Sequence, residues 1–430
     1  MTMNHFWDNN VTVFKFGGAS VKDAAGVRNL HSILEKHPDE TLFVVISAMG
    51  KTTNLLEKIL QAYFYRKESP TPLFNQLKEN HLKIVNELDM PQQELAEVIE
   101  PVFCQLENKL QTVPTDCYEF EYDQIVSFGE ILSTKLISKY LKLKGMSNLW
   151  LDARQVMRTD RTYTEARIQW EDSEQRLKKA LTAGGHAPQL CITQGFIAGA
   201  ADGTATTFGR EGSDYSAAII AYILDAKSVT IWKDVPGLLN ADPKFYPEAV
   251  KLESISYEEA IELAYYGATI IHPKTLKPLQ NKNIPLYIKP FLAPTESGSI
   301  ISANGTSENI PSYIFKREQI LITLFPKDFS FISVENLSEI FSILSRNGVK
   351  INLMQNTALS FSICTDLNPH RIPQVLEQLG RNFTVKYNEN MELITIRHYT
   401  DATIAKVVGD RPVFAEQRSR TTVQMVVKPQ

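Results

Sequence analysis

The sequence predicts an α/β protein built on an open sheet with parallel strands and followed by an α+β region. A short apolar strand at residues 11–16 ends in a glycine pair and is followed by helical spacing to residue 34. A near-continuous apolar run at residues 41–47 is typical of a parallel strand that helices cover on both faces. From about residue 312 the predicted elements follow the order βαββα.

The composition is that of a globular chain. Its 430 residues suggest about three domains, and the 43% apolar and 22% charged residues lie in the globular range. The net charge of −4 gives no basic footprint for nucleic acid, and no run of lysines or arginines points to a membrane surface. We therefore expect small-molecule or protein partners, with no nucleic acid and no membrane.

The N-terminal residues and the cysteines predict a cytoplasmic protein. The first residues lack a positive region followed by an apolar core, and no apolar run approaches about 18 residues, so neither a signal peptide nor a transmembrane helix is expected. The cysteines are too few and too scattered for a disulfide framework, and a reducing compartment fits them. We interpret all of them as buried, inert thiols: Cys104, Cys117, Cys191 and Cys364.

A guanidinium, a hydroxyl and a carboxylate surround two glycines at residues 208–214. The glycines let backbone N–H groups approach a ligand closely, and the positive end of the apolar helix predicted after them favours anions. Arg210 suits a carboxylate or phosphate, whereas Asp214 is a natural partner for a lysine or a metal ion. The stretch predicts an anion site, and a solvated turn with Ser213 or Asp214 as the helix N-cap is the alternative.

The first strand places a lysine beside a glycine loop. Lys15 lies in the strand, and Gly17 and Gly18 follow it before a helix, which is a common phosphate-cradling arrangement in open α/β sheets. These residues form neither a Walker P-loop nor a dinucleotide-binding fingerprint. Lys15 is therefore a candidate phosphate ligand, with a charge on an edge strand as the alternative.

A helical insertion follows the second strand. A turn of small, hydroxyl and amide residues at 48–54 leads into residues 55–118, which are mainly helical in period and contain several prolines that start or break helices. An amphipathic helix is predicted at residues 123–140, and it carries Glu130 next to Gly129 and apolar residues. A lone glutamate on a helix is usually solvated, but this apolar setting makes Glu130 a candidate site residue.

Further strands are predicted at residues 190–194, 228–232 and 285–288, with helical patterns between them. His272 precedes Pro273 at the start of one of these helices. We interpret His272 as a residue that makes a structural hydrogen bond at the helix start, rather than as a catalytic one.

Seven segments of this chain resemble those of aspartate kinase in type and in order. They are residues 15–21, 47–55, 128–133, 193–196, 208–214, 234–244 and 267–276. Each is weak alone, but seven in sequence are specific. The resemblance implies a three-layer α/β/α amino-acid-kinase fold over residues 1–310. It also implies MgATP-dependent phosphorylation of the β-carboxylate of L-aspartate to 4-phospho-L-aspartate, the first step toward lysine, threonine and methionine.

The chemistry agrees with this inventory, because a carboxylate nucleophile is already ionised near neutral pH and needs no general base. By resemblance, Lys15 and Asp214 are catalytic: Lys15 reaches the phosphates, and Asp214 orients it or acts near Mg²⁺. The implied ligands of aspartate are Arg210 for its α-carboxylate, Glu130 for its ammonium group, and Thr53 and Ser213 for further hydrogen bonds. The implied ligands of ATP are Lys15, Gly17, Gly18, Ser47, Lys233, Asp234 and Lys244.

Four positions depart from the family pattern near the implied nucleotide site. Relatives more often have threonine or serine, tyrosine, arginine and lysine where this chain has Lys233, Leu239, Lys244 and Thr269. The adenine and phosphate contacts are therefore expected to be rearranged, with Lys233 replacing the charge that is missing at Thr269. We assign no role to Leu239.

Residues 311–430 resemble the ACT regulatory module, an α+β fold of the ferredoxin-like kind. Aspartate kinases usually carry two such modules, which form the dimer interface and the inhibitor sites. The second is predicted to be incomplete, because the polar stretch at residues 398–420 shows no full amphipathic helix. Asn352 and Ala358 stand where lysine-sensing relatives commonly have acidic residues, so an amino-acid effector fits the region but inhibition by lysine is a weak hypothesis. We expect a homodimer through this region, and a dimerisation module without a ligand is the alternative.

Two other functions are open at this stage. A kinase of the same fold for another acid, for UMP or for carbamate is disfavoured by the pairing of Glu130 with Arg210. A catalytically weak metabolite sensor is motivated by the altered nucleotide positions, whereas the presence of Lys15 and Asp214 argues against it. Turnover of ATP distinguishes the sensor from the kinase.

Overall fold

The computed structural model describes residues 11–183, 188–268, 271–306, 310–328 and 330–429. The chain divides into two compact units. The first unit comprises residues 1–238, 253–257 and 271–306, and the second comprises residues 239–252, 258–270 and 307–430.

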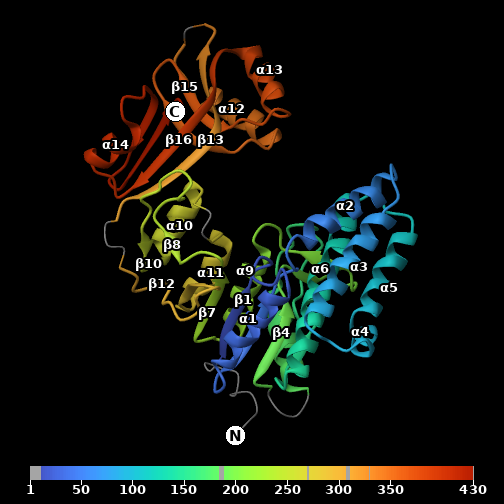
Figure 1. Cartoon of the computed structure of the whole chain (residues 1–430). Coiled ribbons are helices and arrows are strands. Elements are labelled where there is room, and N and C mark those ends of the chain that lie inside the picture. Colours follow the sequence, from blue (N-terminus) through green and yellow to red (C-terminus); the bar gives the residue numbers. More distant parts are fainter. Residues whose placement is uncertain (1–10, 184–187, 269–270, 307–309, 329, 430) are drawn as a thin grey trace. The chain divides into compact units, whose positions relative to one another are not determined.

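The first unit contains an eight-stranded sheet (Figure 1), in which neighbouring strands are parallel except for β11 and β12. The strands β1, β2 and β4 are buried along their whole length, because helices cover both faces as their apolar runs predicted. In spatial order the strands are β10 (Ser254–Ser256), β12 (Ser299–Ser302), β11 (Leu286–Pro290), β7 (Ser228–Lys233), β1 (Val11–Phe16), β2 (Thr41–Ile46), β4 (Leu190–Gln194) and β3 (Leu149–Leu151).

Successive side chains of β1 point to opposite faces of this sheet. The ring of Phe16 contacts the ring of Phe291, whose backbone oxygen accepts a hydrogen bond from Asn29 of helix α1 at 2.7 Å. Lys15 points to the other face, where its ammonium group meets Asp214 of helix α9. Helices α1 (Ala24–Glu35) and α6 (Tyr118–Leu143) cover the face of Phe16, where the ring of His31 contacts that of Tyr140, and α9 (Gly212–Ile223) covers the face of Lys15.

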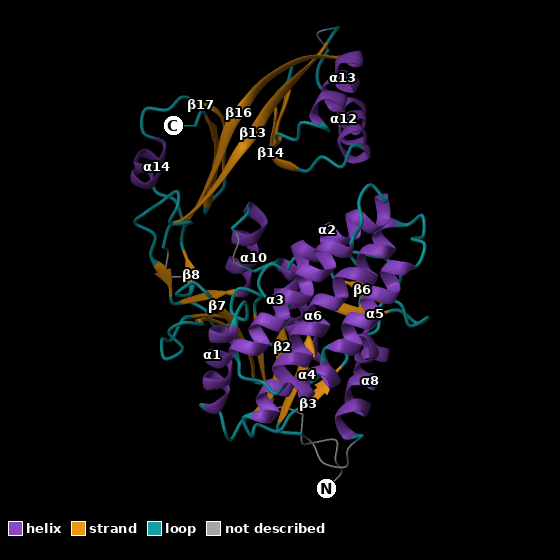
Figure 2. Cartoon of the chain, turned by 45° about the vertical axis from the view of Figure 1, so that its right-hand side comes forward, coloured by secondary structure: helices purple, strands orange, loops and turns teal. Residues whose placement is uncertain are grey.

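The predicted helical insertion is a group of helices that pack against one another and against α6, and Figure 2 shows them together. Prolines stand before or at the first turns, where a missing N–H costs nothing. The inserted helices are α2 (Thr52–Tyr65), α3 (Thr71–Glu87), α4 (Gln92–Val98) and α5 (Glu100–Gln111). The remaining elements of the unit are α7 (Ala153–Val156), α8 (Trp170–Thr182), the hairpin β5 (Ile197–Gly199) and β6 (Ala205–Thr207), and α11 (Pro273–Asn281).

The second unit is built on a six-stranded antiparallel sheet. Its two long central strands run through both halves of the sheet, and helices α12 and α13 bury an apolar core with one half. In spatial order the strands are β14 (Ile351–Asn356), β15 (Phe361–Asp366), β13 (Ser312–Pro326), β16 (Phe383–Arg397), β18 (Thr422–Val427) and β17 (Val413–Arg418). The other elements are β8 (Leu238–Leu239), β9 (Lys251–Leu252), α10 (Tyr257–Tyr266), α12 (Val334–Arg346), α13 (Ile372–Asn382) and α14 (Asp401–Val408), although Leu238 and Tyr257 belong to the first unit.

The predicted fold class is confirmed: a three-layer α/β/α unit with a helical insertion is followed by an α+β, ACT-like region. The polar stretch at residues 398–420 holds the short helix α14 and the strand β17, where no full helix was expected. Only Val407 and Val408 of α14 are buried, so its apolar pattern is too short to be recognised.

Two further predictions concern membranes and thiols. Among the described residues, no helix is long and apolar enough to cross a bilayer. The prediction that all four thiols are buried is wrong for Cys104 and Cys117, which are exposed, whereas Cys191 and Cys364 are buried. Cys104 lies on α5 and Cys117 immediately precedes α6, and the helices of the insertion are covered on one side only.

Candidate active site

The carboxyl ends of β7, β1, β2 and β4 lie along one edge of the sheet, because these four neighbouring strands are parallel. A cavity of about 850 Å³ opens at this edge. It is lined by nine of the residues that the sequence singled out: Lys15, Gly18, Ser47, Thr53, Glu130, Arg210, Ser213, Asp214 and Lys233.

Asp214 joins two strands of the sheet to α9 through lysines. Its Oδ1 atom lies 2.6 Å from Lys15 Nζ, and its Oδ2 atom lies 3.7 Å from Lys233 Nζ. Burial would raise the pKa of Asp214, but the two ammonium groups hold that pKa below its ordinary value. Two cations therefore share one carboxylate, which leaves positive charge for a further anion. Lys15 is 8% exposed on a central strand, so the edge-strand alternative is excluded.

Glu130 is a second buried carboxylate, and only 3% of it is exposed. Ser213 Oγ donates to Glu130 Oε1 at 2.9 Å and accepts from the backbone N–H of Phe196 at 3.3 Å. Burial raises the pKa of Glu130 to about 7, although the hydrogen bond from Ser213 and the charge of Lys15 oppose that rise. Oε2 is buried without a hydrogen-bond partner of good geometry among the described residues, and the backbone N–H groups of Gly195 and Ala48 near the carboxylate also oppose the rise of its pKa.

The glycines of the strand ends allow close backbone packing. A Cβ atom at Gly18 would lie 2.5 Å from the backbone oxygen of Ala48, and Gly50 N–H donates to Gly18 O at 2.9 Å. A Cβ atom at Gly195 would lie 2.4 Å from Ser213 Cβ. Larger residues at Gly18 or Gly195 would therefore push apart the loops that hold the cavity together.

Arg210 stands at the mouth of the cavity and is exposed. The preceding Gly209 has φ +72°, and a Cβ atom there would lie 2.8 Å from Thr164 O. Helix α9 begins at Gly212 with Glu211 as its N-cap, so Ser213 and Asp214 lie in its first turn. The alternative of a solvated turn capped by Ser213 or Asp214 is therefore excluded, and the positive end of α9 faces the cavity.

Comparison with known proteins places this geometry in a family. The model of the amino acid kinase family matches residues 10–290. The chain belongs to the amino acid kinase family. Within it, lysine-sensitive aspartokinase 3 of Escherichia coli (strain K12) is 31% identical over 83% of this chain and 79% of its own length. Chloroplastic aspartokinase 1 of Arabidopsis thaliana is 29% identical over 89% of this chain and 70% of its own length. These matches place the chain among the aspartokinases of the family.

A longer relative and a solved structure extend this result. The maize chloroplastic bifunctional aspartokinase/homoserine dehydrogenase 1 is 31% identical, but the match spans only 33% of its length. The structure of Escherichia coli aspartokinase III in complex with aspartate and ADP superposes with a TM-score of 0.80 at 26% identity, covering 97% of this chain and 96% of that one. The predicted resemblance to aspartate kinase is thus confirmed.

Some residues that the family resemblance singled out do not line this cavity. Gly17 lies beside it, since a Cβ atom there would be 3.6 Å from Lys15 Nζ. Asp234 follows β7 outside the lining, and Lys244 belongs to the second unit. Thr269 lies outside the described residues.

The interpretation of His272 is confirmed. It is the N-cap of α11, and its Nδ1 atom accepts from the backbone N–H of Lys274 at 3.2 Å.

One wall of this cavity, which contains Thr164 and Glu165, was not predicted from the sequence. Asp123, fully buried on α6, holds that wall by accepting from the backbone N–H groups of Thr164 and Thr207 at 3.0 Å and from Thr207 Oγ1 at 2.6 Å. Burial raises the pKa of Asp123 to about 6, against these hydrogen bonds. The one signal in the sequence is that Asp123 precedes Glu130 by two helical turns, which places both on one face of α6.

Proposed function

We propose that this chain is an aspartate kinase, which transfers the γ-phosphoryl group of ATP to the β-carboxylate of L-aspartate and forms 4-phospho-L-aspartate. The aspartokinase relatives and the aspartate- and ADP-bound neighbour support the reaction. One observation carries the proposal: a single cavity combines Asp214 between two lysines with buried Glu130 and exposed Arg210. It thus offers cations to phosphates and groups of opposite charge to the two ends of an amino acid.

In this proposal the aspartate binds at the α6 side of the cavity. Glu130 Oε2 accepts from the ammonium group, and Arg210 pairs with the α-carboxylate through two parallel hydrogen bonds. Thr53 and Ser213 add hydrogen bonds, and Ser213 already fixes the orientation of Glu130. The β-carboxylate is left to face the lysine pair. It is ionised near neutral pH, so the transfer needs no general base.

The nucleotide is assigned to the strand ends. Lys15 and Lys233 neutralise the phosphates, while Gly17, Gly18 and Ser47 offer a close backbone approach to them. Asp234 and Lys244 are proposed as further nucleotide contacts on the basis of the family pattern.

Mg²⁺ usually binds through substrate phosphates and only one or two carboxylates. Asp214 fits that mode, because it is an ionised carboxylate beside the lysines. When bound, Mg²⁺ neutralises charge on the transferring phosphoryl group. Lys15 and Lys233 hold the phosphates in line with the carboxylate, so the residues of the chain contribute alignment and charge.

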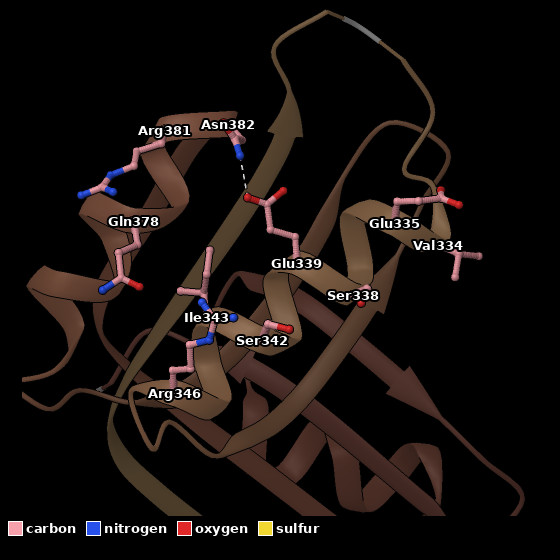
Figure 3. A pocket seen from close by; sticks show the side chains of 10 residues that line it. All are labelled: Val334, Glu335, Ser338, Glu339, Ser342, Ile343, Arg346, Gln378, Arg381 and Asn382. Carbon is pink, nitrogen blue, oxygen red and sulfur yellow. Dashed lines mark hydrogen bonds between the residues drawn. The ribbon is translucent and has the colours of Figure 1, made fainter.

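A homodimer is proposed through the second unit. A groove of about 890 Å³ runs between α12 and α13 (Figure 3), with Glu335 and Glu339 toward one end of α12 and Arg346 at the other. Ser338 and Ser342 lie between them. This face is complementary to itself: a two-fold axis perpendicular to α12 makes two copies of the helix antiparallel, which sets each acidic end against the arginine of the other copy.

An effector is proposed for the same unit, but lysine is disfavoured. The similar structure of Escherichia coli aspartokinase III was solved in complex with lysine and aspartate. Here Asn352 Oδ1 already accepts from Lys316 Nζ at 3.0 Å, and its Nδ2 donates to Gln319 and Asp366. Asn352 carries no charge to pair with an ammonium ligand, and neither does Ala358. We place the protein in the cytoplasm, as its free cysteines fit a reducing compartment.

The test is the hydroxamate assay, in which hydroxylamine traps an acyl phosphate formed from purified protein, MgATP and L-aspartate. L-Glutamate is the parallel substrate. Signal with aspartate alone is expected. Signal with glutamate at equal strength would contradict the assignment of Arg210 and Glu130. Absence of signal from folded protein that binds aspartate would support the metabolite sensor instead.

A further inference from the structure

A second cavity, of about 1050 Å³, lies next to the candidate active site in the first unit. It is bounded by the start of α1, the loop between β2 and α2, and the outer faces of α2 and α3. Gly50 lines both cavities, so the loop after β2 is their common wall. None of the proposed substrate or nucleotide ligands lines the second cavity.

The walls of this second cavity are strongly basic in a chain whose net charge is −4. They carry the cationic residues Lys22, Arg28, Lys51, Lys58 and Lys83 and the acidic residues Asp23 and Glu87.

Each of the two carboxylates already has a partner within the fold. Asp23 caps α1 by accepting from Gly26 N at 2.8 Å, and Glu87 lies 3.9 Å from Lys83. Among the described residues, Lys22, Lys51 and Lys58 form no ion pair, and all three are exposed. The cations of the cavity outnumber its two carboxylates, so the excess positive charges repel one another, and a bound anion relieves that repulsion.

A buried histidine adds a different kind of partner. His81 of α3 lines the cavity and is 1% exposed. Its Nδ1 atom lies 2.8 Å from Leu77 O, and because a carbonyl only accepts, Nδ1 carries the proton. Burial lowers the pKa of His81, so the ring is neutral and Nε2 is an acceptor, which has no partner among the described residues. A ligand hydroxyl is the group that would satisfy it.

We propose that this second cavity binds a small phosphate-bearing molecule with hydroxyl groups, of the sugar-phosphate class, through Lys22, Lys51 and Lys58. The binding itself does not depend on the proposed kinase activity.

The shared wall connects the site to phosphoryl transfer. Gly50 has φ +54°, and a Cβ atom there would lie 3.3 Å from Lys22 Cβ. On its other side, Gly50 N–H donates to Gly18 O at 2.9 Å. A phosphate bound by Lys22 and Lys51 would therefore contact both the loop after β1 and the loop after β2. Occupancy should change the KM for ATP, and this second part of the inference rests on the proposed function.

The experiment is isothermal titration of the full-length chain with two probes, pyrophosphate and ribose 5-phosphate. The double variant Lys22→Gln/Lys58→Gln should weaken binding of both probes by about tenfold or more. A matched variant, Lys142→Gln/Lys179→Gln, removes two exposed lysines of α6 and α8 and should leave both affinities unchanged. Lys15→Ala should retain binding of ribose 5-phosphate, since Lys15 lines only the first cavity.

Equal weakening by the two lysine pairs would show non-specific attraction and overturn the site. Loss of all binding in Lys15→Ala would place the ligand in the first cavity and overturn it as well. If the chain has kinase activity, ribose 5-phosphate should shift the KM for ATP in the unmodified protein but not in Lys22→Gln/Lys58→Gln. An equal shift in both proteins would overturn the connection while leaving the binding result intact, so failure of the kinase assignment and failure of the site are distinguishable.

Discussion

The two residues proposed to recognise aspartate differ in how they are held. Glu130 is buried, and the Ser213 hydroxyl fixes its orientation, so little order is lost when a ligand arrives. Arg210 is exposed on a glycine-flanked turn and must be ordered by the substrate itself. Glu130 is therefore suited to set selectivity for an amino group, while Arg210 offers positive charge to the α-carboxylate and becomes ordered when the substrate binds.

We expect Arg210→Ala to raise the KM for aspartate by roughly 10- to 100-fold, the value of a charge-assisted hydrogen-bonded pair. The KM for ATP should change much less, because the phosphates are assigned to the lysine pair. Steady-state kinetics with each substrate varied in turn measures both. Arg161→Ala is the control, since Arg161 is an exposed arginine that pairs with Asp202 at 3.1 Å and does not line the cavity. Equal effects of Arg210→Ala on both substrates would sink the assignment.

Glu130 predicts a pH dependence of substrate capture. Its pKa is raised to about 7 by burial, so below that pH the carboxyl group is protonated and cannot pair with an ammonium group. The kcat/KM for aspartate should therefore fall as the pH is lowered from about 7 to 5.5, approaching tenfold per unit. Glu130→Gln should have a lower kcat/KM that lacks this step. A flat profile in the unmodified protein, or the same step in Glu130→Gln, would contradict the role of Glu130.

At the scale of elements, helix α6 organises both sides of the cavity. Glu130 faces the substrate from its middle, and Asp123, two turns earlier, holds the Thr164 wall and the end of β6. Since Gly209 packs against Thr164 O, the Asp123 contacts also determine where Arg210 stands. Helix α6 thus contributes Glu130 to the proposed substrate site and, through Asp123, positions the loop that carries Arg210.

Asp123→Ala should separate this positioning from stability. Alanine has no acceptor, so the backbone N–H groups of Thr164 and Thr207 lose their partner, at a cost of about 1–3 kcal/mol each in the free energy of unfolding. The KM for aspartate should rise by roughly tenfold or more because the wall shifts. Gln124→Ala is the matched control: Gln124 bonds Ala205 N and O from the same helix but does not line the cavity. A similar rise of KM in both variants would reduce Asp123 to a purely structural role.

The strands that form the site could be predicted because each is a buried apolar run that ends in small residues. The strand positions, together with the family motifs, predict that Lys15, Glu130 and Asp214 meet, and all three line the cavity. The wall at Thr164 could not be predicted, since long-range hydrogen bonds to Asp123 rather than local pattern hold it. The helix predicted after residues 208–214 begins earlier, at Gly212, although glycine has a low helix propensity.

At the scale of the whole molecule, the candidate active site and the long antiparallel strands belong to different units. The first contains every residue that lines the candidate active site, and the second is built on two strands, β13 and β16, long enough to serve both halves of its sheet. Within the second unit, Arg397 of β16 pairs with Glu259 and Glu262 of α10, which fastens that helix to the sheet.

The self-complementary face of α12 and α13 yields a prediction for assembly. Arg346→Glu sets like charges against Glu335 of a second copy on both sides of the two-fold axis, so the dimer dissociation constant should rise by at least about tenfold. Combining it with Glu335→Arg exchanges the charges and should restore the dimer, which sedimentation velocity over a concentration series measures. Arg420→Glu, an exposed arginine outside the groove, makes the same charge change and should have no effect. If Arg346→Glu behaves like Arg420→Glu, or if the exchanged pair stays monomeric, the two copies meet through another surface, because a charge contact across the axis must respond to both changes in opposite directions.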